Sequence, residues 1–267
     1  MPERGLPPLP ATPALFLLAH HDDELFIAAT LRRLVRQGEV TVLWLTQGGL
    51  GAAGRRAESV TAMELLGVPP DALRYMCLPD NHLLAYLPQV VVRLRRLICR
   101  LRPASVFVPA FEGGHQDHDT VQLAAARALA CLAPEPHWRP RLYEFPLYHW
   151  QPGHLPVVGR LPAGIPPQQQ TPLKLRDRLL TQKLTRIYAS QKFILYPMFA
   201  IKGGPMMLHL GGEPFREVPA GRDYAETPLG TRPAYEYFML RRFSRFAAAA
   251  RSTAPHRQGS AAPAPCR

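Results

Sequence analysis

The stretch LFLLAHHDDELF, residues 15–26, decides the fold, because an apolar run ends abruptly in two histidines and three acidic residues. Its first five residues, Leu15–Ala19, predict a short strand that is buried on both faces. Charged groups at the end of such a strand are costly to bury unless they bind a partner there. The question is therefore whether a second polar cluster meets this one in space.

Strand-like and helix-like segments alternate along the N-terminal half of the chain. Strand patterns occupy residues 14–19, 40–46, 72–78, 104–109 and 141–145, and helical patterns occupy 24–37, 55–66, 88–101 and 118–131. With 267 residues, of which 47% are hydrophobic, the chain is long enough to bury a sizeable core. The alternation predicts an α/β fold, a Rossmann-like three-layer domain with a mainly parallel sheet.

The C-terminal part has a different composition. Residues 151–172 are rich in Pro, Gly and Gln and predict a long loop; a helix is expected at 173–190, and residues 193–237 are irregular. We expect one domain over residues 1–246, made of a core at 14–146 and a loop-rich elaboration at 147–246. Residues 247–267 are mostly Ala, Pro, Ser and Arg, which predicts a disordered tail.

The formal net charge is +12, which suggests an anionic partner. The densest basic cluster is RLRRLICRLR, residues 93–102. Its arginines alternate with apolar residues at helical spacing, so a solvated helix face is favoured over a binding stripe. No aromatic interleaving, helix-turn-helix or zinc-finger spacing supports nucleic-acid binding.

The cysteines and the apolar runs bear on location. Cys77, Cys99, Cys131 and Cys266 form no CxxC pair, which favours reduced thiols in a cytoplasmic protein. No run approaches the ~20 apolar residues that a membrane span needs. We therefore expect a cytoplasmic protein without an integral membrane segment.

A second polar cluster, FEGGHQDHD at residues 111–119, follows the strand pattern at 104–109. Ligands of open parallel sheets bind beyond the carboxyl ends of the strands, so both clusters belong at one edge of the sheet. Helix capping is the simpler interpretation of each cluster alone. Two clusters that each combine His with Asp favour a metal site, because two imidazoles and a carboxylate with an open fourth position form a catalytic zinc arrangement.

The two clusters resemble known signatures. AHHDDE at residues 19–24 is similar to AHPDDE, and GGHQDHD at 113–119 to HPDH, both of the LmbE/PIG-L family of zinc-dependent N-acetyl sugar deacetylases. Weaker matches follow the same order: GRRAESVTAMELLGV at 54–68, LPDN at 78–81 and YASQ at 188–191. The resemblance covers roughly residues 14–191.

The resemblance implies a catalytic metal, Zn²⁺ or another divalent ion such as Fe²⁺. Its ligands would be His20, Asp23 and His118. Asp22 would be the general base for the metal-bound water. A polarised carbonyl, a carboxylate base and a cation near the developing oxyanion suffice for amide hydrolysis.

The resemblance also implies roles for four further residues. His115 would stabilise the oxyanion or act as an acid, and Asp117 would orient and tune it. Arg55 and Asp80 would contact the sugar.

The sequence departs from the family pattern at three positions. His21 and Gln116 replace the prolines of the two signatures, and proline there shapes the turn without binding the metal. His21 is a candidate ligand or substrate contact, although a hydrogen-bonded loop histidine is the favoured interpretation. Gly113 stands where certain relatives have a tyrosine that assists the oxyanion. Tyr188 and Tyr196 are candidates for that role, with core packing the favoured interpretation of each.

The function implied by the resemblance is removal of the N-acetyl group from an N-acetylglucosamine-like sugar or glycoconjugate. One alternative is a metal-dependent amidase that acts on another amide, such as a thiol conjugate. Another is a non-catalytic sugar-binding module of the same fold. Intact Asp22 and His115 argue against the module, because metal binding alone needs neither.

Overall fold

The computed structural model describes residues 8–48, 52–150, 157–162, 169–196 and 211–252. Its central sheet has seven strands in the order β3-β2-β1-β4-β5-β9-β8. The strands β1 to β5 are parallel, whereas β9 runs antiparallel to β5 and β8 antiparallel to β9. The strands of this sheet are β1 (Ala14–Leu18), β2 (Val40–Thr46), β3 (Leu73–Leu78), β4 (Ser105–Pro109), β5 (Arg141–Phe145), β8 (Gln169–Pro172) and β9 (Gly212–Glu217). The predicted α/β fold with a mainly parallel sheet is confirmed.

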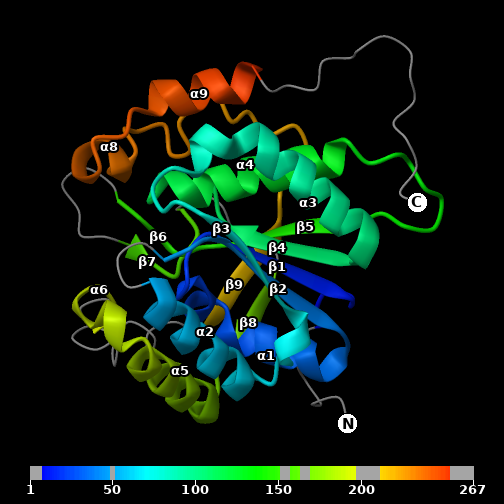
Figure 1. Ribbon diagram of the computed structural model, residues 1–267, viewed down its shortest axis with the longest axis vertical. Helices are drawn as coiled ribbons and strands as arrows, with labels where there is room; N and C mark the ends of the chain where they lie inside the picture. Colours follow the sequence, from blue (N-terminus) through cyan, green and yellow to red (C-terminus); the bar gives the residue numbers. More distant parts are fainter. Residues whose placement is uncertain (1–7, 49–51, 151–156, 163–168, 197–210, 253–267) are drawn as a thin grey trace.

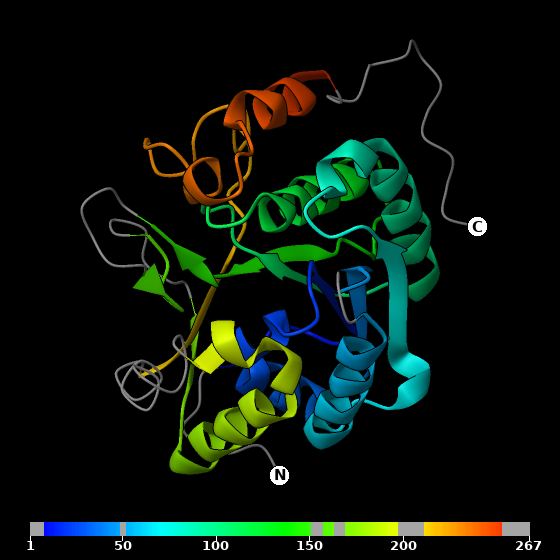
Figure 2. The same cartoon turned by 60° about the vertical axis from the view of Figure 1, so that its left-hand side comes forward.

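Helices cover both faces of the sheet (Figure 1). One face carries α1 (Ala28–Gln37), α2 (Ala52–Leu66) and α5 (Leu175–Ile187), and the other carries α3 (Leu87–Leu101), α4 (Gln116–Ala130) and α9 (Phe243–Ser252). A second view, turned by 60°, shows the same two helical layers with the sheet between them (Figure 2). The remaining elements are the short helices α6 (Lys192–Tyr196) and α8 (Ala234–Phe238), the 3-10 turns η1 (Asp23–Phe26), η2 (Pro70–Ala72), η3 (Leu83–Tyr86) and η4 (Ala189–Gln191), and a two-stranded ribbon of β6 (Tyr148–His149) and β7 (Val157–Val158).

The first strand separates two hydrophobic cores. Phe16 and Leu18 pack into the core on the α1 side, and Leu15 and Leu17 into the core on the α3 side. Side chains of a strand alternate between the faces of its sheet, so an uninterrupted apolar run is needed where both faces are covered. The expectation from the opening stretch is confirmed.

The chain order creates a switch point between β1 and β4. From β1 the chain proceeds outward through β2 to β3, and then returns to place β4 on the other side of β1. Connections leave in opposite directions at this point, which opens a crevice at the carboxyl ends of the two strands. The two polar clusters of the sequence follow these two strands.

The C-terminal elaboration is more regular than the sequence predicts. Strand β9 lies within the stretch 193–237, which was expected to be irregular. Its sequence, GEPFRE, lacks the apolar alternation of a strand, yet its first five residues are buried. The charged side chains are accommodated by partners elsewhere in the chain: Glu213 binds the start of α1, and Arg216 pairs with Glu144 of β5.

Two expectations about the C-terminus and the cysteines need correction. Residues 247–252 are helical, because α9 buries Phe243, Phe246 and Ala247 against the domain; residues 253–267 lie outside the described residues. Cys77 and Cys131 are free, but Cys99 is disulfide-bonded. Sequence spacing reveals only nearby cysteine pairs, which is why reduced thiols were expected there.

Among the described residues, every helix is too short or too polar to cross a membrane. The cytoplasmic location stays a prediction.

Candidate active site

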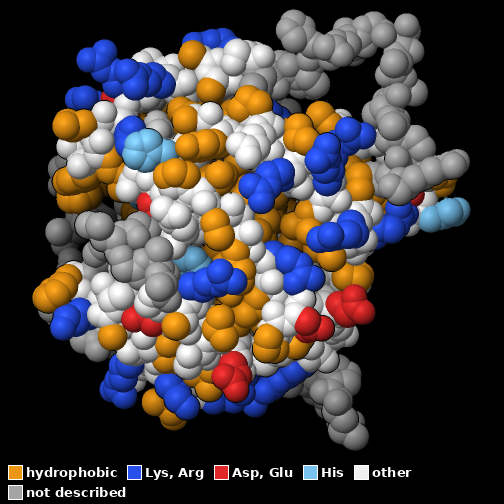
Figure 3. Space-filling model, viewed as in Figure 1, with side chains coloured by type: hydrophobic (Ala, Val, Ile, Leu, Met, Phe, Trp, Pro, Cys, Tyr) orange, Lys and Arg blue, Asp and Glu red, His pale blue; other side chains and the backbone are white. Residues whose placement is uncertain are grey.

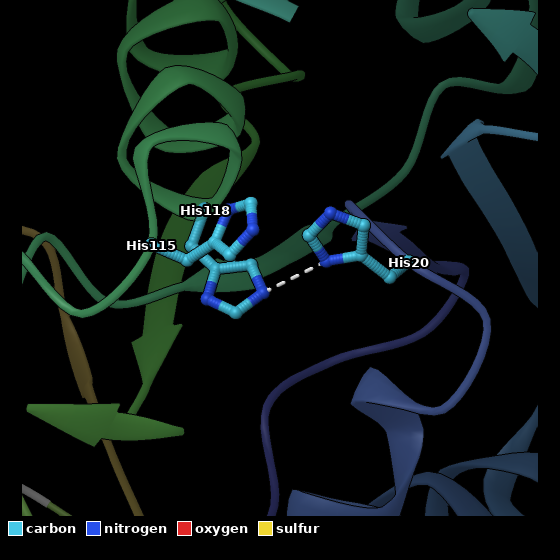
Figure 4. Close-up of side chains that lie close together, drawn as sticks. All are labelled: His20, His115 and His118. Carbon is cyan, nitrogen blue, oxygen red and sulfur yellow. Dashed lines mark hydrogen bonds between the residues drawn. The ribbon is translucent and has the colours of Figure 1, made fainter. Parts of the chain in front are cut away.

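Three histidines from two strand ends point toward one another (Figure 4). His20 follows β1, and His115 and His118 lie at the start of α4, after β4. One nitrogen from each ring lies within 4.8 Å of the others. The switch point of the sheet thus brings together the two clusters, which are far apart in sequence.

The three predicted metal ligands form a compact triangle of donor atoms. His20 Nδ1 lies 3.1 Å from His118 Nε2, and Asp23 Oδ1 lies 3.2 Å from His118 Nε2 and 3.8 Å from His20 Nδ1. Ligands about 2.0–2.2 Å from a tetrahedral zinc are separated by similar distances. All three side chains are nearly buried, so these lone pairs would repel one another without a cation or a shared proton between them.

Two sets of hydrogen bonds orient these donors. His20 Nε2 lies 3.3 Å from Asp117 Oδ2, which fixes the proton on Nε2 and turns Nδ1 toward the triangle. Asp23 Oδ2 accepts hydrogen bonds from the backbone N–H groups of Ala19 and His20, at 2.8 and 2.9 Å, which leaves Oδ1 for the metal. The donor set therefore fits a divalent metal such as zinc. His118 Nδ1 is buried and has no hydrogen-bond partner within the described ranges.

The environment of His115 favours a hydrogen-bond donor over a fourth ligand. Its Nδ1 accepts a hydrogen bond from the backbone N–H of Asp117, at 3.0 Å, so its proton must sit on Nε2. Burial, together with the charges of His20 and His118, holds the pKa of His115 well below its usual range. A neutral imidazole with a protonated Nε2 can donate a hydrogen bond to a developing oxyanion.

Asp117 makes most of its contacts with groups other than His115. Its carboxylate contacts His20, and it also accepts the backbone N–H groups of Asn81 (2.6 Å) and Leu83 (3.1 Å). Only its backbone N–H hydrogen-bonds His115. Asp117 thus contacts the predicted metal ligand His20 through its carboxylate and His115 through its main chain.

Asp22 has a strained backbone at the start of the turn η1. Its φ of 128° is unusual for a residue other than glycine and costs about 1–3 kcal/mol. Burial raises the pKa of Asp22 to about 7, and the neighbouring charge of Asp23 adds to the shift, while Arg55 opposes both. The side chain lines the cavity beside the metal triangle, where a general base would be needed.

Arg55 connects three strand ends, and its guanidinium is largely committed to the protein. One terminal nitrogen donates to the Gly48 carbonyl (2.9 Å) and to Asp80 (3.4 Å). The other donates to Asp22 Oδ2 (3.3 Å) and to the His21 carbonyl (3.5 Å). Arg55 and Asp80 both line the cavity, and their contact with a sugar stays a prediction. The hydrogen bonds indicate that Arg55 positions Asp22.

A cavity of about 260 Å³ opens over these groups. The lining residues are His20, Asp22, Asp23, Phe26, Arg55, Asp80, Asn81, His115, His118, Tyr148, Gln191, Leu195 and Met239. All the predicted site residues except Asp117 line it, and Asp117 reaches it through His20. The C-terminal elaboration contributes further walls through residues such as Gln191 and Met239.

Tyr148 is the residue that the sequence reasoning missed. It follows β5, the strand next to β4, so it reaches the same edge of the sheet as the two histidine clusters. Its ring lies edge-on to His118, with the ring centroids 5.6 Å apart. Burial, together with the charges of Asp23 and Asp22, raises the pKa of Tyr148, so its hydroxyl stays protonated. The sequence shows a polar residue after a third strand of the sheet, but not that its side chain reaches the cavity.

The glycines of the second cluster make room for Tyr148. A Cβ on Gly114 would lie 1.9 Å from the carbonyl oxygen of Tyr148, and Gly113 has a φ of +71°. The side chain of Glu112 accepts the backbone N–H groups of Leu147 (2.7 Å) and Tyr148 (2.9 Å). A tyrosine at position 113 is therefore disfavoured by its neighbourhood, and one from β6 is held in the cavity instead.

Tyr188 and His21 are buried and hydrogen-bonded within the protein, which agrees with the favoured interpretation of each residue. Tyr188 is fully buried, and its hydroxyl hydrogen-bonds Glu24. His21 Nδ1 lies 2.6 Å from Ser59 Oγ, its ring stacks on Trp44, and burial lowers its pKa to about 4. Neither lines the cavity. The side chain of Tyr196 lies outside the described residues.

The fold and the geometry agree with comparisons to known proteins. Residues 15–129 match the sequence model of the PIG-L family, described as GlcNAc-PI de-N-acetylase. This part of the chain is similar to the PIG-L family. The matched segment contains both histidine clusters, so the resemblance drawn from the motifs is confirmed. A search of curated proteins finds no match to the chain.

Solved structures with the same fold include two deacetylases. N,N'-diacetylchitobiose deacetylase from Pyrococcus horikoshii is 21% identical, with a TM-score of 0.56, 77% of this chain and 83% of that one covered. The zinc-inhibited form of teicoplanin deacetylase Orf2 is 16% identical, with a TM-score of 0.54 and coverage of 78% and 100%. The conserved protein TT1542 from Thermus thermophilus is 24% identical, with a TM-score of 0.57 and coverage of 78% and 98%.

Proposed function

We propose that this protein is a metal-dependent N-deacetylase that acts on an N-acetylglucosamine-like sugar or glycoconjugate. The observation that carries the proposal is the triangle of His20, Asp23 and His118 donors beside the carboxylate of Asp22, in one cavity. The PIG-L match and the deacetylases among the structural neighbours support the reaction class. The 260 Å³ cavity has room for about one sugar ring, since pockets for drug-sized ligands start near ~300 Å³.

A divalent metal held by this triangle would supply a polarised carbonyl and a more acidic water. Asp22 takes a proton from the attacking water as the water oxygen bonds to the acetyl carbon. The His115 Nε2–H and the Tyr148 hydroxyl are the donors placed to stabilise negative charge on the former carbonyl oxygen. The proton that Asp22 accepted from water then passes to the leaving nitrogen as the C–N bond breaks, which releases acetate and the free amine.

Arg55 and Asp117 prepare this arrangement without taking part in bond changes. Arg55 holds the Asp22 carboxylate and the strand ends around it, and Asp117 fixes the tautomer of His20. A sugar-binding module would need the cavity, but neither a carboxylate on a strained backbone nor a buried imidazole donor. These features favour catalysis over binding alone.

The test of reaction and substrate is acetate release from a panel of N-acetyl amino sugars, their glycosides and an N-acetylated thiol conjugate, with added zinc. We expect release from the N-acetylglucosamine derivatives and little from the thiol conjugate. Release from the thiol conjugate alone would favour the amidase alternative. Binding of sugars without release from any compound would favour the module.

Metal analysis tests the ligand assignment separately. His118→Ala should sharply reduce the bound metal, because it removes one corner of the donor triangle. His137→Ala is the matched control, since His137 is exposed and lines no part of the cavity. Full metal occupancy in His118→Ala would remove this residue from the ligand set.

A further inference from the structure

A second hollow, of about 370 Å³, lies at the open edge of the sheet between β3 and α3. It shares no lining residue with the active-site cavity. Its lining residues are Leu43, Arg74, Tyr75, Met76, Arg93, Arg96, Leu97 and Arg100. Figure 3 shows Lys and Arg side chains gathered around hydrophobic surface on the face that carries α3. We call this hollow the arginine groove.

Three of its arginines come from the basic cluster of the sequence. Arg93, Arg96 and Arg100 are spaced three and four residues apart, which places them on one side of α3. Arg74 reaches the groove from β3, and its guanidinium is held by the carbonyls of Asp71 (2.5 Å) and Leu73 (2.9 Å). The cluster is therefore more organised than a solvated helix face, because a second element adds a fourth arginine.

Within the described residues, no acidic side chain neutralises the positive charge of the groove. No carboxylate lines it, and none of the four guanidinium groups forms an ion pair within the part of the chain that the structure describes. Four like charges around one hollow repel one another, and a multivalent anion would relieve that repulsion. Guanidinium groups match phosphate oxygens in geometry and bind them with charge-assisted hydrogen bonds.

The floor of the groove has a different character. Leu43, Met76 and Leu97 supply apolar surface between the arginines. Arginines alone can protect an open sheet edge from pairing with another chain. That protective role requires charge but no hollow with an apolar floor, and the volume falls within the range of about 300–1,000 Å³ typical of small-molecule sites.

We propose that the arginine groove binds a small phosphorylated organic molecule. Its phosphate groups lie on the arginines, and its apolar or ring portion lies on Leu43, Met76 and Leu97. The proposal is independent of the deacetylase function, since the two sites have no residue in common.

Calorimetric titration of the full chain with ADP and with inorganic pyrophosphate tests the proposal. We expect ADP to bind more tightly than pyrophosphate, because only ADP has a ring to cover the apolar floor. Both affinities should fall as salt is added. The double variant Arg93→Ser/Arg96→Ser should weaken ADP binding by about tenfold or more, as expected for lost charge-assisted hydrogen bonds.

The matched control is Arg32→Ser/Arg36→Ser, which removes the same charge from α1 and should leave ADP binding near the wild-type affinity. An equal loss in both double variants would overturn the proposal in favour of net charge. His118→Ala should retain ADP binding, and its loss there would assign the ligand to the metal site. Absence of ADP binding at millimolar concentration would overturn the proposal, and binding only to anionic vesicles would replace it with a membrane surface.

Discussion

The core at residues 14–146 and the C-terminal elaboration both bury polar and charged groups, but these groups face different targets. In the core, Asp22, His115 and the three predicted metal ligands line the cavity. In the elaboration, Tyr188, Glu213 and Arg216 point back at the core and are hydrogen-bonded to it. The core supplies the proposed base and metal ligands, whereas these three residues of the elaboration support the core. Tyr148, at the start of the elaboration, is an exception, because it lines the cavity.

The largest expected effect tests the first half of this comparison. Asp22→Asn should lower turnover by about 10²–10⁴-fold, because the amide cannot accept a proton from water. Metal content and the thermal midpoint should stay near wild type. Turnover by the variant close to the wild-type rate, with metal bound, would place the base elsewhere in the cavity.

The opposite pattern is expected for Glu144, which joins the core to the elaboration. It is buried on β5 and hydrogen-bonds Arg216 (2.5 Å) and Arg222 (2.5 and 2.7 Å). Glu144→Ala should cost about 3–5 kcal/mol of unfolding free energy, since two buried guanidinium groups lose their partner. Denaturant unfolding measures the loss, and Glu135→Ala, which breaks a more exposed pair with Arg102, is the control.

The ion pairs of Glu144 with Arg216 and Arg222 should also make the stability of the protein depend on pH. Burial raises the pKa of Glu144, but the hydrogen bonds and charges of Arg222 and Arg216 outweigh burial and hold the pKa below its usual range. A carboxyl whose pKa is lower in the folded state stabilises the fold above its unfolded pKa of about 4.3. That contribution is lost as the pH falls through the folded pKa. The stability gap between wild type and Glu144→Gln should therefore narrow below about pH 4.3, and a constant gap would contradict the ion-pair assignment.

Tyr188→Phe tests whether the elaboration supports the catalytic turn. Tyr188 donates to Glu24, and Glu24 Oε2 accepts the backbone N–H of the strained Asp22 at 3.3 Å. Loss of the hydroxyl should cost about 1–3 kcal/mol in stability, because a buried acceptor loses its partner. We expect kcat to fall with KM little changed. An unchanged kcat would confine Tyr188 to packing.

Glu213→Gln should have the smallest effect. Glu213 accepts the N–H groups of Ala29 and Thr30, each at 2.8 Å, so it caps a helix whose own cap residue, Ile27, offers no side-chain acceptor. The single amide oxygen of Gln can accept only one of these two hydrogen bonds. A weakened cap costs about 0.5–2 kcal/mol of unfolding free energy. A loss well above that range, measured by denaturant unfolding, would show that Glu213 does more than cap α1.

The sequence predicted the core well because its signals are local. An apolar run at 15–19 and the His–Asp pairs after two strands are sufficient to indicate a parallel sheet and a polar site at its edge. Strand β9 was missed because its charges are satisfied by residues far away in sequence. Tyr148 was missed for a related reason: its place in the cavity depends on the close approach of its backbone to Gly114, which sequence spacing does not encode.

The cap on α1 bears on how the chain acquires its shape during synthesis. The turn that carries Asp22 and Asp23 leads directly into α1, and the first N–H groups of that helix are satisfied by Glu213. A ribosome releases the N-terminal end first, so a nascent chain can form the early strands while this helix start still depends on water. The catalytic turn would become rigid only after β9 has emerged and docked. A fragment that ends before β9 would then contain every predicted metal ligand and base, but its catalytic turn would lack the support that the late strand provides.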